Sequence, residues 1–138
     1  MKEYKYFIDT NIFLRVLVGS DNKFYDESLG FLKKIKAGKM SAVTSDLVLS
    51  EINWVLRKQY GFSKENVIEA IKSILYLKNL KIENNTNMAE ALLLYQNHKV
   101  KFIDALLATG CKNNYTIVSY DKDFDKLGLK RFEPKDLK

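Results

Sequence analysis

Four acidic side chains occupy places where the sequence would otherwise bury apolar residues or end a strand. Asp9 interrupts the run FIDTNIFLRVLV, Glu51 lies in SEINWVL, and Asp104 lies in FIDALLA. A further acidic group begins at Asp121 in SYDKDFDKL, directly after a β-branched stretch. Because burying an unpaired carboxylate costs free energy, each of these acids requires a partner.

A divalent cation is a partner that would satisfy all four acids at once. Carboxylates that converge on one point repel each other and cannot all remain ionised without a cation. Their hard oxygen atoms favour Mg²⁺ or Mn²⁺. Such a cation keeps several bound waters, and a water held by further acids can attack a phosphodiester. Asp9 is explained if it is a metal ligand at the end of a strand.

Each acid also has a purely structural explanation, which the sequence leaves open. Asp9 could cap the helix that follows it, and Asp104 could interact with a helix dipole. Glu51 could extend its carboxylate to solvent or form an ion pair with Arg57 or Lys58, and the acids of residues 121–125 could belong to a solvated turn. A metal site is absent only if all four explanations hold together.

Short strands alternate with helices along the chain, and these elements would position the acids. The patterns predict strands over residues 4–9, 40–45, 80–83, 115–120 and 131–134, helices over 11–18, 23–37, 46–61, 63–78, 86–98 and 101–114, and a turn or short helix over 121–127. This order predicts an α/β fold with a parallel sheet covered by helices on both faces. Sites in such folds gather at the carboxyl ends of the strands, where Asp9 and Asp121 both lie.

Short polar residues and glycines mark the expected ends of several helices. Asp46, Ser63 and Thr86 are the expected first residues or N-caps, because their side chains can accept hydrogen bonds from free backbone N–H groups. Gly38 and Gly61 are expected to end the helices before them, because glycine adopts left-handed backbone conformations easily.

The composition predicts a single cytosolic domain over residues 1–138, without membrane association. Hydrophobic residues make up 46% of the chain, enough for one sizeable core. No apolar run approaches the roughly 18 residues of a membrane span, and MKEYKYFIDTN lacks the apolar stretch of a signal peptide. The lone Cys111 excludes an internal disulfide and a CxxC site, and is expected to be buried on a helix.

Other catalytic chemistries find little support in the sequence. His98 is the only histidine and lies in the polar segment QNHK, where an interaction with the helix dipole is expected. The chain has no GxGxxG and no P-loop motif. Lys101 could meet a phosphate, although a solvated lysine is the expected outcome. The net charge of +6 and the pI of about 9.3 point to a polyanionic partner, such as nucleic acid or a membrane surface.

Four motifs, taken together and in order, resemble the PIN domain family. They are FIDTN near the start, SEINWVL, FIDALLA and SYDKDF. The branch that they resemble most is that of the VapC-type toxins of type II toxin–antitoxin systems. The resemblance extends over essentially the whole chain and shows no departure at the four acids. It implies a PIN-like α/β fold of about five parallel strands sandwiched between helices.

The resemblance also implies a Mg²⁺- or Mn²⁺-dependent endoribonuclease, with RNA as substrate, a cognate antitoxin protein as partner and a homodimeric assembly. The motifs assign the catalytic and metal-binding roles to Asp9, Glu51, Asp104 and Asp121, with Asp123 as an auxiliary ligand. Thr10 or Asn11, and Ser119, match polar positions that orient the metal site. The cleavage target and the antitoxin are not encoded in these motifs.

Other functions remain open on the sequence alone. A PIN-type nuclease could act in RNA processing without a toxin role, and a non-catalytic RNA-binding module could keep the same fold. A Mg²⁺-dependent phosphatase could use a similar acidic pocket, but its acids lie at strand ends, whereas Glu51 and Asp104 are expected within helices. Tyr60, Tyr95 or Tyr120 could stack on unpaired bases, although core or interface positions are expected.

Overall fold

A five-stranded parallel sheet lies at the centre of the structure, a computed structural model that describes residues 3–137. The strands follow the spatial order β3-β2-β1-β4-β5. Their bounds are Tyr4–Ile8 for β1, Ser41–Ser45 for β2, Leu80–Glu83 for β3, Thr116–Val118 for β4 and Arg131–Phe132 for β5. The predicted α/β fold with a parallel sheet is therefore confirmed, and each strand lies within its predicted range.

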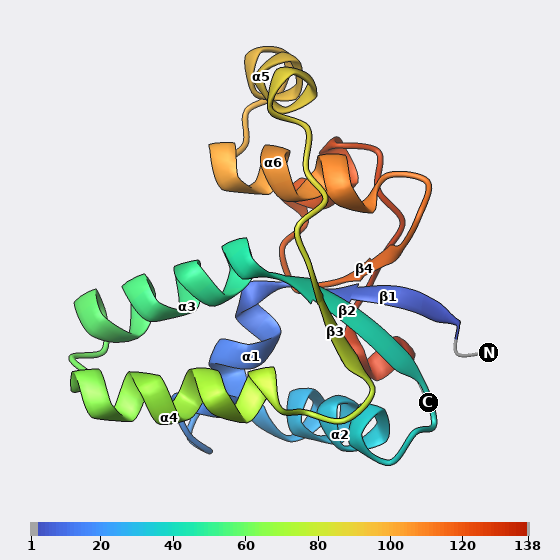
Figure 1. Cartoon of the computed structure of the whole chain (residues 1–138). Helices are drawn as coiled ribbons and strands as arrows, with labels where there is room; N and C mark the ends of the chain where they lie inside the picture. The colour runs from blue at the N-terminus through green and yellow to red at the C-terminus, as the bar shows by residue number, and fades with distance from the viewer. Residues whose placement is uncertain (1–2, 138) are drawn as a thin grey trace.

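Helices cover both faces of this sheet (Figure 1), with α1, α2 and α4 on one side and α5 and α6 on the other. Their bounds are Thr10–Leu17 for α1, Tyr25–Lys36 for α2, Asp46–Lys58 for α3, Lys64–Leu75 for α4, Met88–Asn97 for α5, Phe102–Cys111 for α6 and Asp123–Lys126 for α7, followed by a 3₁₀ turn over Pro134–Asp136. Among residues 3–137, no helix has the length and apolar character needed to cross a membrane.

The predicted helices are all present, but two of the expected N-caps are wrong. Ser45, not Asp46, caps α3, because its extended backbone lets its hydroxyl accept a hydrogen bond from the Leu47 amide at 3.1 Å. Asn87, not Thr86, caps α5 through an equivalent bond from the Glu90 amide. Asp46 is already the first residue of α3, and Thr86 precedes the true cap of α5. The sequence does not distinguish such neighbouring polar residues, because each could act as a cap.

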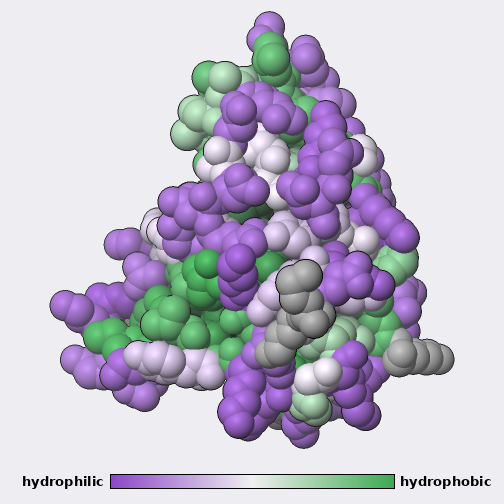
Figure 2. Space-filling view, turned by 45° about the vertical axis from the view of Figure 1, so that its right-hand side comes forward, coloured by the Kyte–Doolittle hydropathy of each residue, from purple (hydrophilic) through white to green (hydrophobic). Residues whose placement is uncertain are grey.

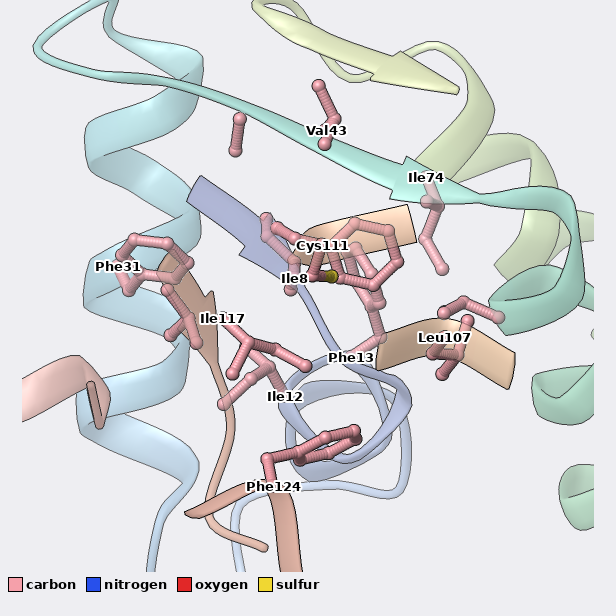
Figure 3. Packing of buried hydrophobic residues seen from close by; sticks show 14 of the residues in the cluster. Ile8, Ile12, Phe13, Phe31, Val43, Ile74, Leu107, Cys111, Ile117 and Phe124 are labelled. Carbon is pink, nitrogen blue, oxygen red and sulfur yellow. The ribbon is translucent and has the colours of Figure 1, made fainter. Parts of the chain in front are cut away.

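The core explains why the first strand reads as an apolar run. Phe7 and Ile8 are consecutive and therefore point to opposite faces of β1, yet both are buried. Helices on each face of the sheet remove both side chains from water, as in other buried parallel sheets. Figure 3 shows Ile8 packed with Ile12, Phe13 and Ile117 from neighbouring elements. Cys111 is free and buried at the end of α6, as predicted.

The register of β1 against β4 brings two polar segments together. Ile8 pairs with Val118, and the amide of Asp9 extends the ladder by donating to the Val118 carbonyl at 3.1 Å. Asp9 and Ser119 therefore leave the sheet side by side at its carboxyl edge. The chain continues from β1 toward β2 on one side and from β4 toward β5 on the other, so this edge is the topological switch point of the sheet.

Gly110 allows α6 to pack closely against the segment that follows β3. A Cβ atom at Gly110 would lie 2.5 Å from the carbonyl oxygen of Asn85, which belongs to the backbone and cannot rotate away. The Asn87 amide donates to Thr109 Oγ1 at 2.9 Å, which also holds this segment against α6. The absence of a side chain at Gly110 is therefore a packing requirement.

Gly110→Ala should lower the free energy of unfolding by about 1–3 kcal/mol, because the backbone of residues 85 and 86 must move to admit the methyl group. Gly30→Ala is the matched control, since a Cβ atom at this α2 position meets no atom within 4 Å. That change should be neutral or stabilising, as expected for alanine in a helix. Urea melts of both variants measure the difference, and equal stabilities would contradict the close contact.

Candidate active site

The four predicted acids line one pocket of about 200 Å³. Asp9 follows β1, Glu51 lies in the middle of α3, Asp104 lies in the first turn of α6, and Asp121 follows β4. Four elements that are distant in sequence thus each contribute one carboxyl group. The other lining residues include Thr10, Asn11, Leu14, Val55, Gln59, Tyr60 and Lys101.

Asp9 is fixed by two side chains rather than by the helix that it precedes. It occupies the N-cap position of α1, but its side chain makes no capping hydrogen bond, so the capping explanation fails. Its Oδ2 atom accepts hydrogen bonds from Asn11 Nδ2 at 2.9 Å and from Ser119 Oγ at 2.8 Å. Ser119 Oγ in turn accepts from the Asp121 amide at 3.0 Å. This network joins the ends of β1 and β4.

Glu51 is positioned by a threonine from the neighbouring strand end. Thr10 Oγ1 donates to Glu51 Oε1 at 2.5 Å, which orients the half-buried carboxylate along α3. The structure records no ion pair between Glu51 and any residue in the range 3–137, so the ion-pair explanation also fails. Trp54, three residues after Glu51 on the same face of α3, is 56% exposed, so this face is not uniformly buried.

Asp104 carries the clearest sign of a missing partner. Its side chain is buried, and its Oδ2 atom has no hydrogen-bond partner within the described part of the chain. Burial, followed by repulsion from Asp9 and Asp121, raises the pKa of Asp104 to about 8, although the ammonium group of Lys101 opposes the rise. A buried, unsatisfied carboxylate oxygen is rare in proteins and requires an explanation. Coordination of a cation is one that suits the oxygen chemistry.

Burial raises the pKa of Asp9 as well, to about 6, while the hydrogen bond from Ser119 opposes the shift. Repulsion from Glu51 and Asp121 adds to the rise. Two of the four carboxyl groups are therefore held in surroundings that disfavour their ionised forms. A cation in the pocket would reverse this preference, because it stabilises the ionised forms directly.

Asp104, Asp121 and Asp123 form a compact set of potential ligands. One carboxylate oxygen from each lies within 4.8 Å of the others. The Asp123 amide donates to Asp121 Oδ1 at 2.9 Å, which holds the two residues together at the start of α7. Asp123 also forms an ion pair with Lys126 at 3.0 Å, so part of its charge is already balanced. The set offers only hard oxygen ligands and fits a divalent cation such as Mg²⁺ or Mn²⁺.

Three pocket residues were missed or given a different place by the sequence analysis. Lys101 is exposed as expected, yet it lines the pocket beside Asp104. Gln59 was missed, although it follows Glu51 and Val55 at intervals of four residues and therefore shares their helix face. Tyr60, expected in the core or at an interface, lines the pocket with 52% of its surface exposed and is therefore not in the core.

Comparison with known proteins identifies a family whose model matches most of the chain. The family model described as PIN domain matches residues 6–130. A protein named VapC ribonuclease from Aquifex aeolicus (strain VF5) is 26% identical over 129 residues, covering 92% of this chain and 95% of that one.

Solved structures share the fold at low sequence identity. VapC20 of Mycobacterium tuberculosis, described as a Sarcin-Ricin loop cleaving toxin, has a TM-score of 0.66 at 17% identity and covers 91% of this chain and 96% of its own. VapBC2 from Rickettsia felis, bound to a DNA fragment from its promoter, gives 0.66 at 19%, covering 93% and 97%. PAE2754 from Pyrobaculum aerophilum gives 0.68 at 15%, covering 97% and 92%.

The raised pKa values predict how the stability of the metal-free protein depends on pH. Both aspartates have folded-state pKa values above the ordinary 3.8, about 6 for Asp9 and about 8 for Asp104. Their contribution to stability is complete below about pH 4 and is lost as the pH rises through the folded values. The free energy of unfolding in EDTA should therefore fall between about pH 5 and pH 8, as measured by urea melts.

Asp104→Asn keeps the shape of the side chain and removes its charge, so it should flatten the upper part of this profile. At pH 7 the metal-free variant should be as stable as the wild type or more stable, by roughly 0.5–2 kcal/mol. Asp21→Asn, at an exposed position, should follow the wild-type profile. Strong destabilisation by Asp104→Asn would assign Asp104 a structural role instead.

Proposed function

The chain belongs to the PIN domain family, and on this premise we propose that it is a divalent-metal-dependent endoribonuclease, the toxin of a type II toxin–antitoxin pair. The observation that carries the proposal is the unsatisfied Oδ2 atom of buried Asp104 in a pocket with three further carboxyl groups. The curated relative named a ribonuclease, and the toxin and VapBC structures of the same fold, support the same activity. The positive net charge of +6 suits an RNA substrate.

We assign the metal to Mg²⁺ or Mn²⁺, with Asp9, Asp104 and Asp121 as ligands and Asp123 as an auxiliary ligand. The cation, when bound, supplies Lewis acidity that lowers the pKa of water and balances charge on the phosphate. The chain itself supplies the fixed ligand geometry. Asn11 and Ser119 hold Asp9, and the junction between β4 and α7 holds Asp121.

Glu51 is the residue that we assign to proton transfer. Thr10 occupies its Oε1 atom, and the described part of the chain offers no hydrogen bond to Oε2, which is left to accept a proton from an attacking water. An in-line attack by water on the phosphodiester leaves a 5′-phosphate and a 3′-hydroxyl. Attack by the 2′-hydroxyl commonly uses two histidines, one as general base and one as general acid. His98 is the only histidine of the chain, and it does not line the pocket.

The wild type should cleave single-stranded RNA with Mg²⁺ or Mn²⁺ and should stop when EDTA is added. Asp104→Asn and Glu51→Gln should each reduce the rate by roughly a hundredfold or more, because a ligand or a proton acceptor is lost. Mg²⁺ should raise the melting temperature of the wild type by mass action and that of Asp104→Asn much less. Asp21→Asn is the control for both measurements.

Analysis of the product ends separates the possible outcomes of this experiment. Ends with a 5′-phosphate agree with attack by water, whereas 2′,3′-cyclic phosphates would overturn the assignment. Preferential hydrolysis of a generic phosphomonoester would favour a phosphatase. RNA binding without cleavage under any metal condition would favour a non-catalytic module.

An apolar groove gives the proposed antitoxin a place to bind. The groove has a volume of about 260 Å³ and lies between α1, α2 and α4, with apolar walls formed by Phe13, Leu17, Leu29, Leu32, Ile74 and Leu77. The rest of the lining is Val16, Ser73 and two lysines, Lys33 and Lys36. These properties suit an apolar helix or extended tail that carries acidic residues beside its apolar face.

A homodimer remains part of the proposal, and exposed apolar side chains offer surfaces for it. Met88, Leu92 and Leu93 on α5 are each more than half exposed. Figure 2 shows hydrophobic residues at the top of the molecule, where α5 lies, and over the lower left, where α3 and α4 lie. Contiguous exposed apolar surface of this kind often marks a protein–protein contact.

Overexpression of the wild type should arrest bacterial growth, and co-expression of the product of the adjacent gene should relieve the arrest. Leu29→Lys places a charge in the apolar groove and should prevent this relief while leaving the arrest in place. Ile68→Lys, on the exposed face of α4 outside the groove, is the matched control and should remain subject to relief. Normal growth with active wild type would favour an RNA-processing nuclease without a toxin role.

A further inference from the structure

A second hollow of about 180 Å³ adjoins the acidic pocket. The two hollows share three lining residues, Asn11, Leu14 and Tyr60. Arg15, Val18 and Asn22 complete the second hollow. Because Asn11, Leu14 and Arg15 lie on one face of α1, the two hollows form a single groove that begins at the carboxylates and ends near Arg15.

Arg15 presents a cation with unused hydrogen-bond donors at the far end of this groove. Its guanidinium carbon lies 5.0 Å from the centroid of the Phe24 ring and 5.9 Å from that of Tyr120. These two rings stack on each other with centroids 4.0 Å apart, and the Tyr120 hydroxyl donates to Glu27 at 2.6 Å. The Arg15 guanidinium itself forms no hydrogen bond or ion pair with residues 3–137.

This combination holds the cation in place without neutralising it. The aromatic rings attract the face of the guanidinium and restrict its position. Its N–H groups have no partner among residues 3–137 and can form paired bonds with a phosphate, whose geometry they match. Lys23, Lys81 and Lys130 each lie over one ring, whereas Arg15 lies over both Phe24 and Tyr120 and carries the forked donors of a guanidinium.

Tyr60 forms an aromatic wall between the two hollows. Its amide donates to the Val55 carbonyl at 3.3 Å just after α3, and Gly61 turns the chain with a φ of 66°. The backbone of Tyr60 is therefore fixed, while its side chain is 52% exposed and has no ring or hydrogen-bond partner among the described residues. An exposed ring beside a groove is a platform on which an unpaired base can stack.

We propose that this groove is the subsite for the nucleotide next to the scissile phosphate, with Arg15 bound to its phosphate and Tyr60 stacked on its unpaired base. The inference rests on the proposed ribonuclease function. Asn22 shapes the subsite, because its amide donates to the backbone carbonyls of Arg15 and Gly19 at 2.6 and 2.7 Å. A base inside a duplex has no free face at this position, so the ligand class is single-stranded RNA.

Binding measured without cleavage tests the subsite directly. A fluorescently labelled single-stranded RNA of twelve nucleotides of mixed sequence is titrated in EDTA against Asp104→Asn, which lacks one of the site carboxylates. Adding Tyr60→Ala should raise Kd about tenfold, since stacking contributes roughly 1–3 kcal/mol per base. Adding Tyr60→Phe should restore affinity close to that of the parent. Tyr76→Ala, at the exposed end of α4, is the matched aromatic control and should bind like the parent.

Arg15 is tested through salt dependence, which reports a lost phosphate contact. Arg15→Gln should weaken binding and reduce the slope of log Kd against log salt by about 0.7, the value for one phosphate on a single strand. Arg15→Lys should keep the slope but lose affinity, because lysine cannot form paired bonds with phosphate. Thermal melts accompany both variants, because Arg15 also packs on two rings.

The subsite proposal fails if Tyr60→Ala and Arg15→Gln bind RNA like the parent. It also fails if a duplex of the same sequence binds as tightly as the single strand, or if the parent does not bind the RNA. Failure of the ribonuclease function is recognised separately, as absence of cleavage by the wild type with Mg²⁺ or Mn²⁺. If cleavage is present, Tyr60→Ala should act mainly on KM, and an effect confined to kcat would overturn the binding role.

Discussion

Burial of carboxyl groups that also repel one another is the constraint on which the organisation of this protein depends. Asp9 and Asp104 are buried close to Asp121, and burial together with mutual repulsion raises the pKa values of both. The four acids come from four different parts of the fold, so their proximity depends on tertiary packing rather than on any one helix or strand. The five-stranded sheet and the helices on its faces hold them in place through a core that packs from both sides. The free energy gained by burying that core offsets the free-energy cost of keeping the carboxyl groups buried and close together.

The origin of the acids on different kinds of element distinguishes this pocket from a phosphatase site of similar charge. Two acids follow strands β1 and β4, but Glu51 and Asp104 come from helices α3 and α6. Helices as well as strand ends therefore line the pocket. A polymer can lie across such a pocket, particularly where a neighbouring hollow continues it along α1.

Much of this arrangement was predictable from the sequence, because it depends on local patterns. The alternation of strands and helices predicted the sheet. The acids inside apolar motifs predicted the pocket, because each acid departs from the apolar pattern around it. Asp46 and Thr86 were wrongly expected as caps, because the true caps Ser45 and Asn87 are their polar neighbours of similar propensity. The positions of Arg15 and Tyr60 could not be predicted, because their surroundings come from α2, from the end of β4 and from the turn after α3.

Ser119 shows how completely one side chain can be committed to structure. Its hydroxyl donates its single proton to Asp9, and its oxygen accepts from the Asn11 amide group and from the Asp121 backbone. A hydroxyl has one proton and two lone pairs, so the bonding capacity of Ser119 is saturated. It has nothing left to offer a cation or a nucleophilic reaction. Ser119 therefore has a structural role, because it links Asp9 to Asp121. The distance between these two acids is set by the register of β1 against β4.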